Sequence, residues 1–196
     1  MNVTISLIRS GSTSSEEKGR FLGMRDEDIS ARGEELVRKK DSAAAYPPVN
    51  LVFSSALIRC RETARIIYPN IPAIIVKDLC AFDYGEFEGK LYSEILSDKR
   101  FQEWARLEML TALPGGENPH SFAARCVGAF REIVREMESK QKTNAAIITH
   151  QSVIKTILQR FCIPRSIYRP WRVEWGDCYT MDFDTDTNVA IIRYAP

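Results

Sequence analysis

The order of its apolar segments constrains the fold of this chain more than any other feature of the sequence. Short runs rich in β-branched residues predict buried strands at residues 3–8, 51–54, 73–76 and 145–149. Apolar residues at helical spacing lie between these runs, and two later runs at 179–183 and 189–194 predict a terminal hairpin. Strands that alternate with helices predict an α/β fold, a three-layer α/β/α sandwich with a mostly parallel central sheet.

The helical segments are marked by caps and by apolar periodicity. Ser30 is placed to cap a helix over residues 31–42. Further helices are expected at residues 57–67, 92–98, 99–107, 122–137 and 154–161. No internal repeat, low-complexity tract or linker divides the chain, and 196 residues suffice for one core. We therefore expect a single domain over residues 1–196.

Composition excludes several classes of function. Lys and Arg number 27 against 26 Asp and Glu, without the basic excess of a nucleic-acid-binding protein. No apolar run approaches the length of a membrane span, and residues 3–8 lack the basic flank of a signal peptide. Five cysteines without a Cys-x-x-Cys pair are interpreted as reduced thiols of a cytoplasmic protein. Because the only histidines are His120 and His150, we expect no metal site, and we expect no cofactor.

Polar motifs follow three of the predicted strands. Arg9 and Ser10 come directly after the first, Arg59 lies shortly after the second, and His150 and Gln151 follow the fourth. In an open α/β sheet such residues meet beyond the carboxyl ends of the strands. Guanidinium groups and helix N-termini there suit a phosphate dianion, so inorganic phosphate or a small phosphorylated molecule is the expected partner. The alternative is that the arginines are surface residues and that the histidine is a core residue.

Six motifs resemble those of the histidine phosphatase superfamily, which includes cofactor-dependent phosphoglycerate mutases and α-ribazole phosphatases. They are LIRSGST, GRFLGMRDEDISARGEE, SSALIRCRETA, FDYGEFEGKLYSEI, PGGEN followed by Arg125, and IITHQSVIKTIL. The match runs in the family's order from residue 3 to about residue 160. The resemblance implies a phosphoglycerate mutase-like fold.

The resemblance also implies a chemistry. In that family a histidine after the first strand attacks the phosphoryl group and becomes a phosphohistidine, while a glutamate protonates the leaving oxygen. Carried over, Arg9, Arg59 and His150 bind the phosphate, and Thr13 keeps its place in the motif. Residues 90–113 would form a cap-like insertion over the site. Alternatively, its apolar side chains simply pack the local helices: Tyr92, Phe101, Trp104 and Met109.

Three positions depart from the family pattern. Ser10 stands where the attacking histidine belongs, Ala81 stands where the proton-donating glutamate belongs, and Glu16 replaces an asparagine that contacts phosphate in many members. Loss of a covalent nucleophile costs a factor of about 10⁴–10⁶ in rate. A carboxylate that faces the pocket would also repel a dianion. Such changes, with the scaffold motifs retained, indicate natural loss of catalysis.

Other residues are candidates to replace the missing groups. Ser10 would attack with His150 as base, although a serine phosphate ester breaks down slowly. Glu86 and Glu88 are candidate acids, or else solvated or structural carboxylates. Residues 171–175, which hold two tryptophans, carry no recognisable chemistry and are expected to lead into the final hairpin.

Three hypotheses of function follow. The first is a histidine phosphatase family protein with a phosphate or phosphomonoester pocket and with impaired or absent turnover. The second is a genuine phosphomonoesterase of the α-ribazole phosphatase type, with an engineered or altered nucleophile. The third is a non-enzymatic interaction protein that works through its exposed helices.

Overall fold

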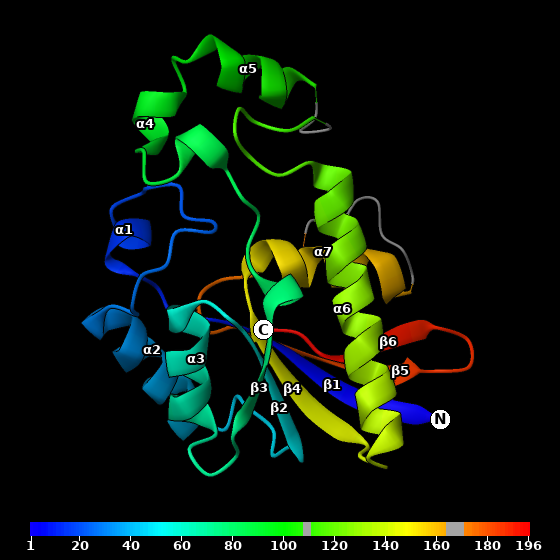
Figure 1. Cartoon of the computed structure of the whole chain (residues 1–196). Helices are drawn as coiled ribbons and strands as arrows, with labels where there is room; N and C mark the ends of the chain where they lie inside the picture. The colour runs from blue at the N-terminus through cyan, green and yellow to red at the C-terminus, as the bar shows by residue number, and fades with distance from the viewer. Residues whose placement is uncertain (108–110, 164–170) are drawn as a thin grey trace.

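A computed structural model describes residues 1–107, 111–163 and 171–196, and its centre is a six-stranded sheet (Figure 1). The strands are β1 (Asn2–Arg9), β2 (Leu51–Ser55), β3 (Ala73–Val76), β4 (Asn144–Thr149), β5 (Cys178–Asp184) and β6 (Val189–Tyr194). Their order across the sheet is β3-β2-β4-β1-β5-β6. The pairs among β1, β2, β3 and β4 are parallel, whereas β5 is antiparallel to β1 and to β6. The predicted α/β fold with a mostly parallel sheet and a terminal hairpin is confirmed.

The helices other than α1 lie where the periodicity predicts them. They are α1 (Ser14–Glu17), α2 (Ala31–Ser42), α3 (Ile58–Ile67), α4 (Tyr92–Ile95), α5 (Lys99–Arg106), α6 (Pro119–Ser139) and α7 (Gln151–Phe161), with 3-10 turns at Lys77–Leu79 and Gly85–Phe87. The Ser30 side chain accepts the N–H of Gly33, as a cap of α2 should. The sequence analysis omitted α1, because this one-turn helix has no apolar periodicity and depends on a capping box between Thr13 and Glu16.

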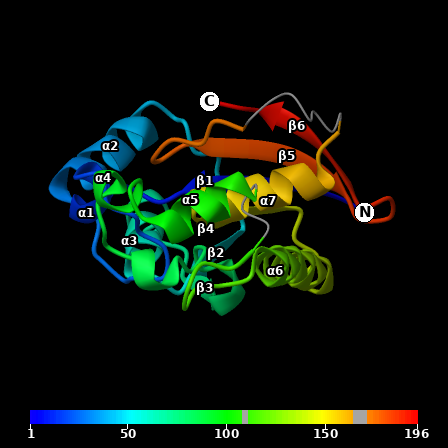
Figure 2. The same cartoon turned by 90° about the horizontal axis from the view of Figure 1, so that it is seen from above.

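Two helical layers cover the sheet because strand side chains alternate between its faces. Val3, Ile5 and Leu7 of β1 pack into one core with α6 and α7. Ile8 belongs to a second core with α2 and α3 on the other face. Figure 2 shows this arrangement from above, with the strands in order from β6 to β3 and with α2 and α3 on the opposite side from α6. The predicted three-layer sandwich is therefore confirmed.

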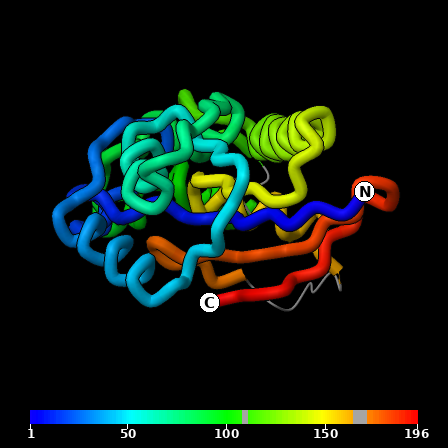
Figure 3. Tube along the Cα trace, turned by 90° about the horizontal axis from the view of Figure 1, so that it is seen from below, coloured from blue at the N-terminus to red at the C-terminus, as the bar shows by residue number. Residues whose placement is uncertain are grey.

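β1 runs through the interior of the sheet, between β4 and β5 (Figure 3). It is parallel to β4, and its last residue, Arg9, pairs with Thr149 at the end of β4. The N–H of Ser10 continues this ladder by donating to the Thr149 carbonyl at 3.0 Å. The residues that follow β1 and β4 therefore leave the sheet side by side.

Residues 90–113 carry α4 and α5, which lie above the carboxyl ends of the strands (Figure 1). Phe101 and Trp104 of α5 are buried, with ring centroids 5.4 Å apart, and Phe101 also packs edge-on against Phe21. Tyr92 is half exposed and stacks on Phe21. Met109 lies outside the described residues. These contacts agree with a packing role for the aromatic residues, and the cap role stays a prediction.

All five cysteines are buried and free, which agrees with the interpretation as reduced thiols. Cys162 is the C-cap residue of α7. Within the described ranges, no helix is both long enough and apolar enough to cross a bilayer.

Candidate functional site

A small cavity of about 70 Å³ opens where β1 and β4 end. Seven of its lining residues are singled out in the sequence, either because they follow a strand or because they depart from the family pattern. The lining residues are Arg9, Ser10, Glu16, Leu22, Arg59, Ala81, Tyr84, His150, Gln151 and Ser152. The convergence expected from the order of the strands therefore occurs.

Arg9 is held in place on three sides. One terminal nitrogen (Nη1) donates to the Val173 carbonyl at 2.8 Å, and the other (Nη2) lies 3.3 Å from Oε1 of Glu16. The guanidinium group also lies over the ring of Trp175, 5.1 Å from its centroid. Burial lowers the pKa of Arg9, and the charge of Glu16 opposes that change. The side chain is therefore a fixed cation in the wall of the cavity.

Arg59 comes from the first turn of α3 and is only 1% exposed. Its two terminal nitrogens donate to the carbonyls of Arg25 at 3.0 Å and Gly23 at 2.7 Å. Carbonyl groups orient a guanidinium group but carry no formal charge, so its positive charge is retained in the cavity. A guanidinium group has five N–H donors, which leaves others for a ligand.

The loop that holds Arg59 is itself held by Glu88. The Glu88 carboxylate accepts the backbone N–H groups of Gly23, Met24 and Tyr84 at 2.9–3.0 Å. A Cβ atom at Gly23 would lie 1.9 Å from the Phe82 carbonyl oxygen, so only glycine permits this close approach. Glu88 is therefore a structural carboxylate, one of the two interpretations that the sequence left open.

His150 directly follows β4 and is the N-cap residue of α7. Its Nε2 atom lies 2.9 Å from the Ser55 hydroxyl and 3.4 Å from the Cys60 thiol. Burial, together with the charges of Arg59 and Arg9, holds the pKa of His150 well below its usual value. The imidazole is consequently neutral at physiological pH.

Ser10 and Ala81 occupy the positions that the resemblance assigns to the nucleophile and the acid. Both are buried, and both line the cavity. In the part of the chain that the structure describes, the hydrogen bonds of His150 go to Ser55 and Cys60, and none joins it to the Ser10 hydroxyl. Ser10 therefore lacks the base contact that activates a serine nucleophile.

Glu16 has a double role at the cavity. Its Oε2 atom accepts the N–H of Thr13 at 3.0 Å, which closes the capping box of α1, while Oε1 faces Arg9. Glu16 is one of the residues that line the cavity, and its side chain is 17% exposed. A negative charge is therefore built into a pocket whose other charged wall residues are arginines.

Of the remaining predicted site residues, one lines the cavity and two do not. Gln151 lines the cavity and donates to the Val173 carbonyl at 3.0 Å. Thr13 is buried beneath α1, where its hydroxyl accepts the N–H of Glu16, and it does not line the cavity. Glu86 points away and forms an exposed ion pair with Arg100 at 2.7 Å. Neither Thr13 nor Glu86 is thus in position to contact a ligand in this cavity.

Residues 171–175 contribute to the site, although no chemistry was expected of them from the sequence. The Val173 carbonyl accepts from both Arg9 and Gln151, and Trp175 covers the Arg9 guanidinium group. Leu22 and Tyr84 of the lining were also missed. A backbone carbonyl leaves no mark in the sequence, and nothing in the sequence around the two tryptophans indicates that Arg9 is the partner of Trp175.

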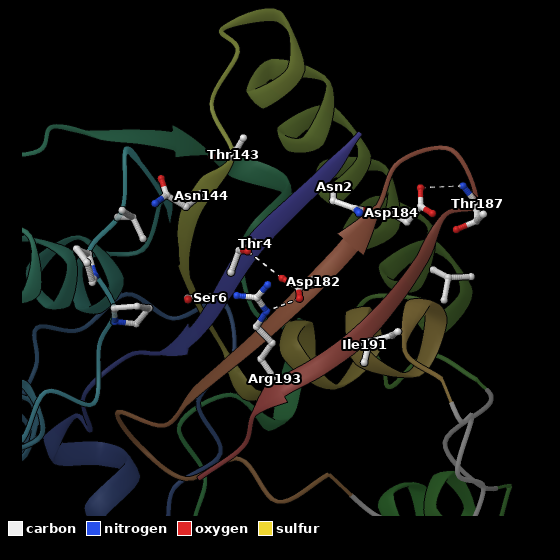
Figure 4. Close-up of a pocket in the computed structure, with 14 residues that line it drawn as sticks. Asn2, Thr4, Ser6, Thr143, Asn144, Asp182, Asp184, Thr187, Ile191 and Arg193 are labelled. Atoms are coloured by element: carbon white, nitrogen blue, oxygen red, sulfur yellow. Dashed lines mark hydrogen bonds and ion pairs between the residues drawn. The ribbon is translucent and has the colours of Figure 1, made fainter.

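A larger hollow of about 760 Å³ lies over the amino-terminal parts of β1 and β4 (Figure 4). We call it the sheet groove; Thr4, Pro48, Asn144, Asp182 and Arg193 are among its lining residues. Thr4 donates to Asp182 at 2.8 Å, and Arg193 forms an ion pair with the same carboxylate. These three polar side chains are therefore bonded to one another.

Two guanidinium groups, a neutral imidazole and the N-terminus of α7 meet at the smaller cavity, and such groups can bind and polarise a tetrahedral oxyanion. Ser10 and Ala81 line the same cavity at the positions that the resemblance assigns to attack and protonation. Among the lining residues that the structure describes, Ser10 is not hydrogen-bonded to His150.

Comparison with known proteins agrees with this architecture. An adenosylcobalamin/alpha-ribazole phosphatase of Escherichia coli strain K12 is 25% identical over 193 residues, covering 95% of this chain and 92% of that protein. A 2,3-bisphosphoglycerate-dependent phosphoglycerate mutase 2 of Gloeobacter violaceus is 27% identical over 161 residues, 78% of this chain and 72% of that protein. The solved structure of the alpha-ribazole phosphatase from Shigella flexneri has the same fold, with a TM-score of 0.81, 23% identity and coverage of 98% and 96%.

The family model of the histidine phosphatase superfamily (branch 1) matches residues 5–193. That range begins in β1, includes every lining residue of the cavity and ends in β6. The chain therefore belongs to the histidine phosphatase superfamily, branch 1.

Proposed function

We propose that this protein binds inorganic phosphate or a phosphomonoester in the cavity between Arg9, Arg59 and His150 and turns such esters over weakly or not at all. The single observation that carries the proposal is the composition of the lining. Arg9, Arg59 and His150 line the cavity, and Ser10 and Ala81 line it at the positions that the resemblance assigns to attack and protonation. This combination supports binding without efficient chemistry.

The hydrogen bonds of the site support weak turnover. Attack by Ser10 needs a base, and His150 is engaged with Ser55 at 2.9 Å. Cys60 does not replace the nucleophile, because burial raises the pKa of its thiol to about 12 and keeps it protonated. Without a covalent nucleophile, the rate is expected to fall by a factor of about 10⁴–10⁶ relative to a complete site.

The test combines phosphate binding with hydrolysis of p-nitrophenyl phosphate. Calorimetry should detect binding of inorganic phosphate to the wild-type protein, loss of that binding in Arg9→Ala, and retention in Arg38→Ala, which removes an exposed arginine paired with Glu34. Hydrolysis by the wild type should be slow or no faster than that by Arg9→Ala. Absence of binding at millimolar phosphate would refute the pocket, and rapid hydrolysis that disappears in Arg9→Ala would refute the impaired turnover.

A second candidate function is a working phosphomonoesterase whose nucleophile alone is altered. It is supported by the names of the relatives, which are phosphatases and a mutase. Ser10→His discriminates the two candidates. If only the nucleophile is missing, this single variant should hydrolyse p-nitrophenyl phosphate well. If the acid is missing too, Ser10→His should remain poor until Ala81→Glu is added.

A further inference from the structure

We propose, on the basis of the phosphate-binding function proposed above, that Glu16 makes the cavity selective for a tetrahedral group with a single negative charge. Such a group is a phosphodiester, or a phosphomonoester in its monoanionic form. The proposal concerns the class of ligand and not the reaction.

The charges that face the cavity sum to one positive charge. Arg9 and Arg59 contribute two positive charges, and the Glu16 carboxylate, 3.3 Å from Arg9, contributes one negative charge. His150 contributes none, because burial and the nearby arginines lower its pKa and keep the imidazole neutral. Tyr84 is also uncharged, since burial raises the pKa of its phenol.

The charges beyond the wall do not change this sum. Around Arg9 and His150, three ion pairs each cancel internally: Glu174 with Arg172, Asp177 with Lys40, and Glu117 with Arg125. Lys155 lies on the Arg9 side of the cavity and Glu88 on the Tyr84 side, with opposite charges. The balance is therefore set by the two arginines and Glu16.

The position of Glu16 keeps its charge in the cavity. The carboxylate is tied at Oε2 to the N–H of Thr13 and at Oε1 to Arg9, and its side chain is only 17% exposed. A bound dianion would place two negative charges next to this carboxylate, where solvent screening is weak. A monoanion matches the single net positive charge, and a cavity of about 70 Å³ restricts the buried part of the ligand to a small group.

Selectivity for a monoanion predicts a characteristic pH dependence. The second pKa of a phosphomonoester is about 6, so about half is monoanionic at about pH 6 and about 1% at about pH 8. If only the monoanion binds, the apparent affinity for methyl phosphate falls about 50-fold over this interval. If only the dianion binds, the affinity rises about twofold instead. Dimethyl phosphate is a monoanion throughout and should bind equally at both values.

The experiment is calorimetric titration of the full chain with methyl phosphate and dimethyl phosphate at both pH values. Glu16→Gln should abolish the loss of methyl phosphate affinity toward high pH, because the carboxylate charge is removed. Glu17→Gln is the matched control: Glu17 lies in the same helix but bonds to Ser12 and Ser30 and does not line the cavity. It should keep the wild-type pH dependence.

The outcomes separate this proposal from the proposed function. Methyl phosphate that binds the wild type more tightly at high pH would overturn the selectivity and leave the phosphate pocket intact. The same would follow if Glu16→Gln kept the wild-type pH dependence. Absence of binding by both ligands, at both pH values and in every variant, would overturn the pocket itself. Binding of dimethyl phosphate in preference to methyl phosphate at both pH values would identify the diester as the natural class.

Discussion

Two hollows of this molecule contrast in size and in charge. The cavity where β1 and β4 end measures about 70 Å³ and holds two arginines against one carboxylate. The sheet groove measures about 760 Å³; there Asp182 pairs with Arg193, and Asp184 adds a further negative charge, so its described lining residues include no unpaired cation. We expect from this comparison that an uncompensated cation at the ends of parallel strands marks an anion site better than volume does.

The difference arises from how each hollow is built. In the groove, Thr4 and Ser6 of β1 lie on a part of the sheet face that α2 and α3 do not cover. Both side chains are polar, and they bond to Asp182 and Thr180 of the neighbouring strand β5. In the cavity, Arg59 is anchored by backbone carbonyls, whereas Arg9 is anchored by one carbonyl and by the Glu16 carboxylate. A carboxylate partner cancels the charge of a guanidinium group and a carbonyl partner does not, so one positive charge remains in the cavity.

The largest effect is expected when a cation of the cavity is removed. Arg59→Met should weaken phosphate binding by about 2–5 kcal/mol, at least about 30-fold in Kd, because a buried charge that binds the anion is lost. Calorimetry with inorganic phosphate measures this change. The control is Arg193→Met in the groove, and an equal loss of affinity there would break the contrast between the two hollows.

A smaller effect, on the free energy of unfolding, is expected when the hydrogen bonds of Thr63 next to the cavity are removed. Thr63 accepts the N–H of Gly11 at 3.0 Å and donates to the Arg59 carbonyl at 2.7 Å. Thr63→Val leaves a buried N–H unpaired and should lower the free energy of unfolding by about 1–3 kcal/mol. Urea unfolding measures it, with Thr156→Val as the half-buried control on α7. Equal free energies of unfolding of the two variants would contradict the view that the hydrogen bonds of Thr63 stabilise the fold more than that of Thr156.

The neutral histidine predicts a pH effect on stability. Burial lowers the pKa of His150 in the folded state, so below the ordinary value near 6.5 the unfolded chain binds a proton that the folded chain refuses. This group should therefore destabilise the fold as the pH falls below about 6.5, by up to about 1.4 kcal/mol per pH unit. Urea unfolding between about pH 7 and about pH 5 should show a shallower loss for His150→Asn. Parallel curves would mean that the imidazole is protonated in the folded protein.

The smallest effect is expected in the sheet groove. Asp182→Asn removes an ion pair with Arg193, whose side chain is largely exposed, and keeps an acceptor for Thr4. It should change the free energy of unfolding by less than about 1 kcal/mol and leave phosphate binding unchanged. Thermal unfolding and calorimetry measure both quantities. A clear change in phosphate affinity would mean that the groove takes part in binding.

Some features of the cavity could be predicted from the sequence alone. Arg9, Arg59 and His150 follow strands, and the sheet rule alone brings them together, so their convergence at the cavity was predictable. The Ser30 cap was equally local and was confirmed. Patterns of a few residues specify such features because spacing and capping act within one element.

The parts that escaped prediction depend on contacts between distant segments. The Val173 carbonyl meets Arg9 across 164 positions of the chain, and a carbonyl is common to every residue. The hydrogen bond between His150 and Ser55 joins residues 95 positions apart, with no repeated spacing to reveal it. Such contacts follow from packing of the whole chain and leave no local pattern in the sequence.

The attachment of Arg59 to the loop at residues 23–25 links ligand binding to the motion of that loop. An anion that draws N–H donors from Arg59 competes with the Gly23 and Arg25 carbonyls, and the amides of Gly23 and Met24 are held by Glu88. Occupancy of the cavity would therefore alter the rate at which these two amide protons exchange with solvent. Hydrogen exchange at these two amides would therefore reveal ligand binding without any need for turnover.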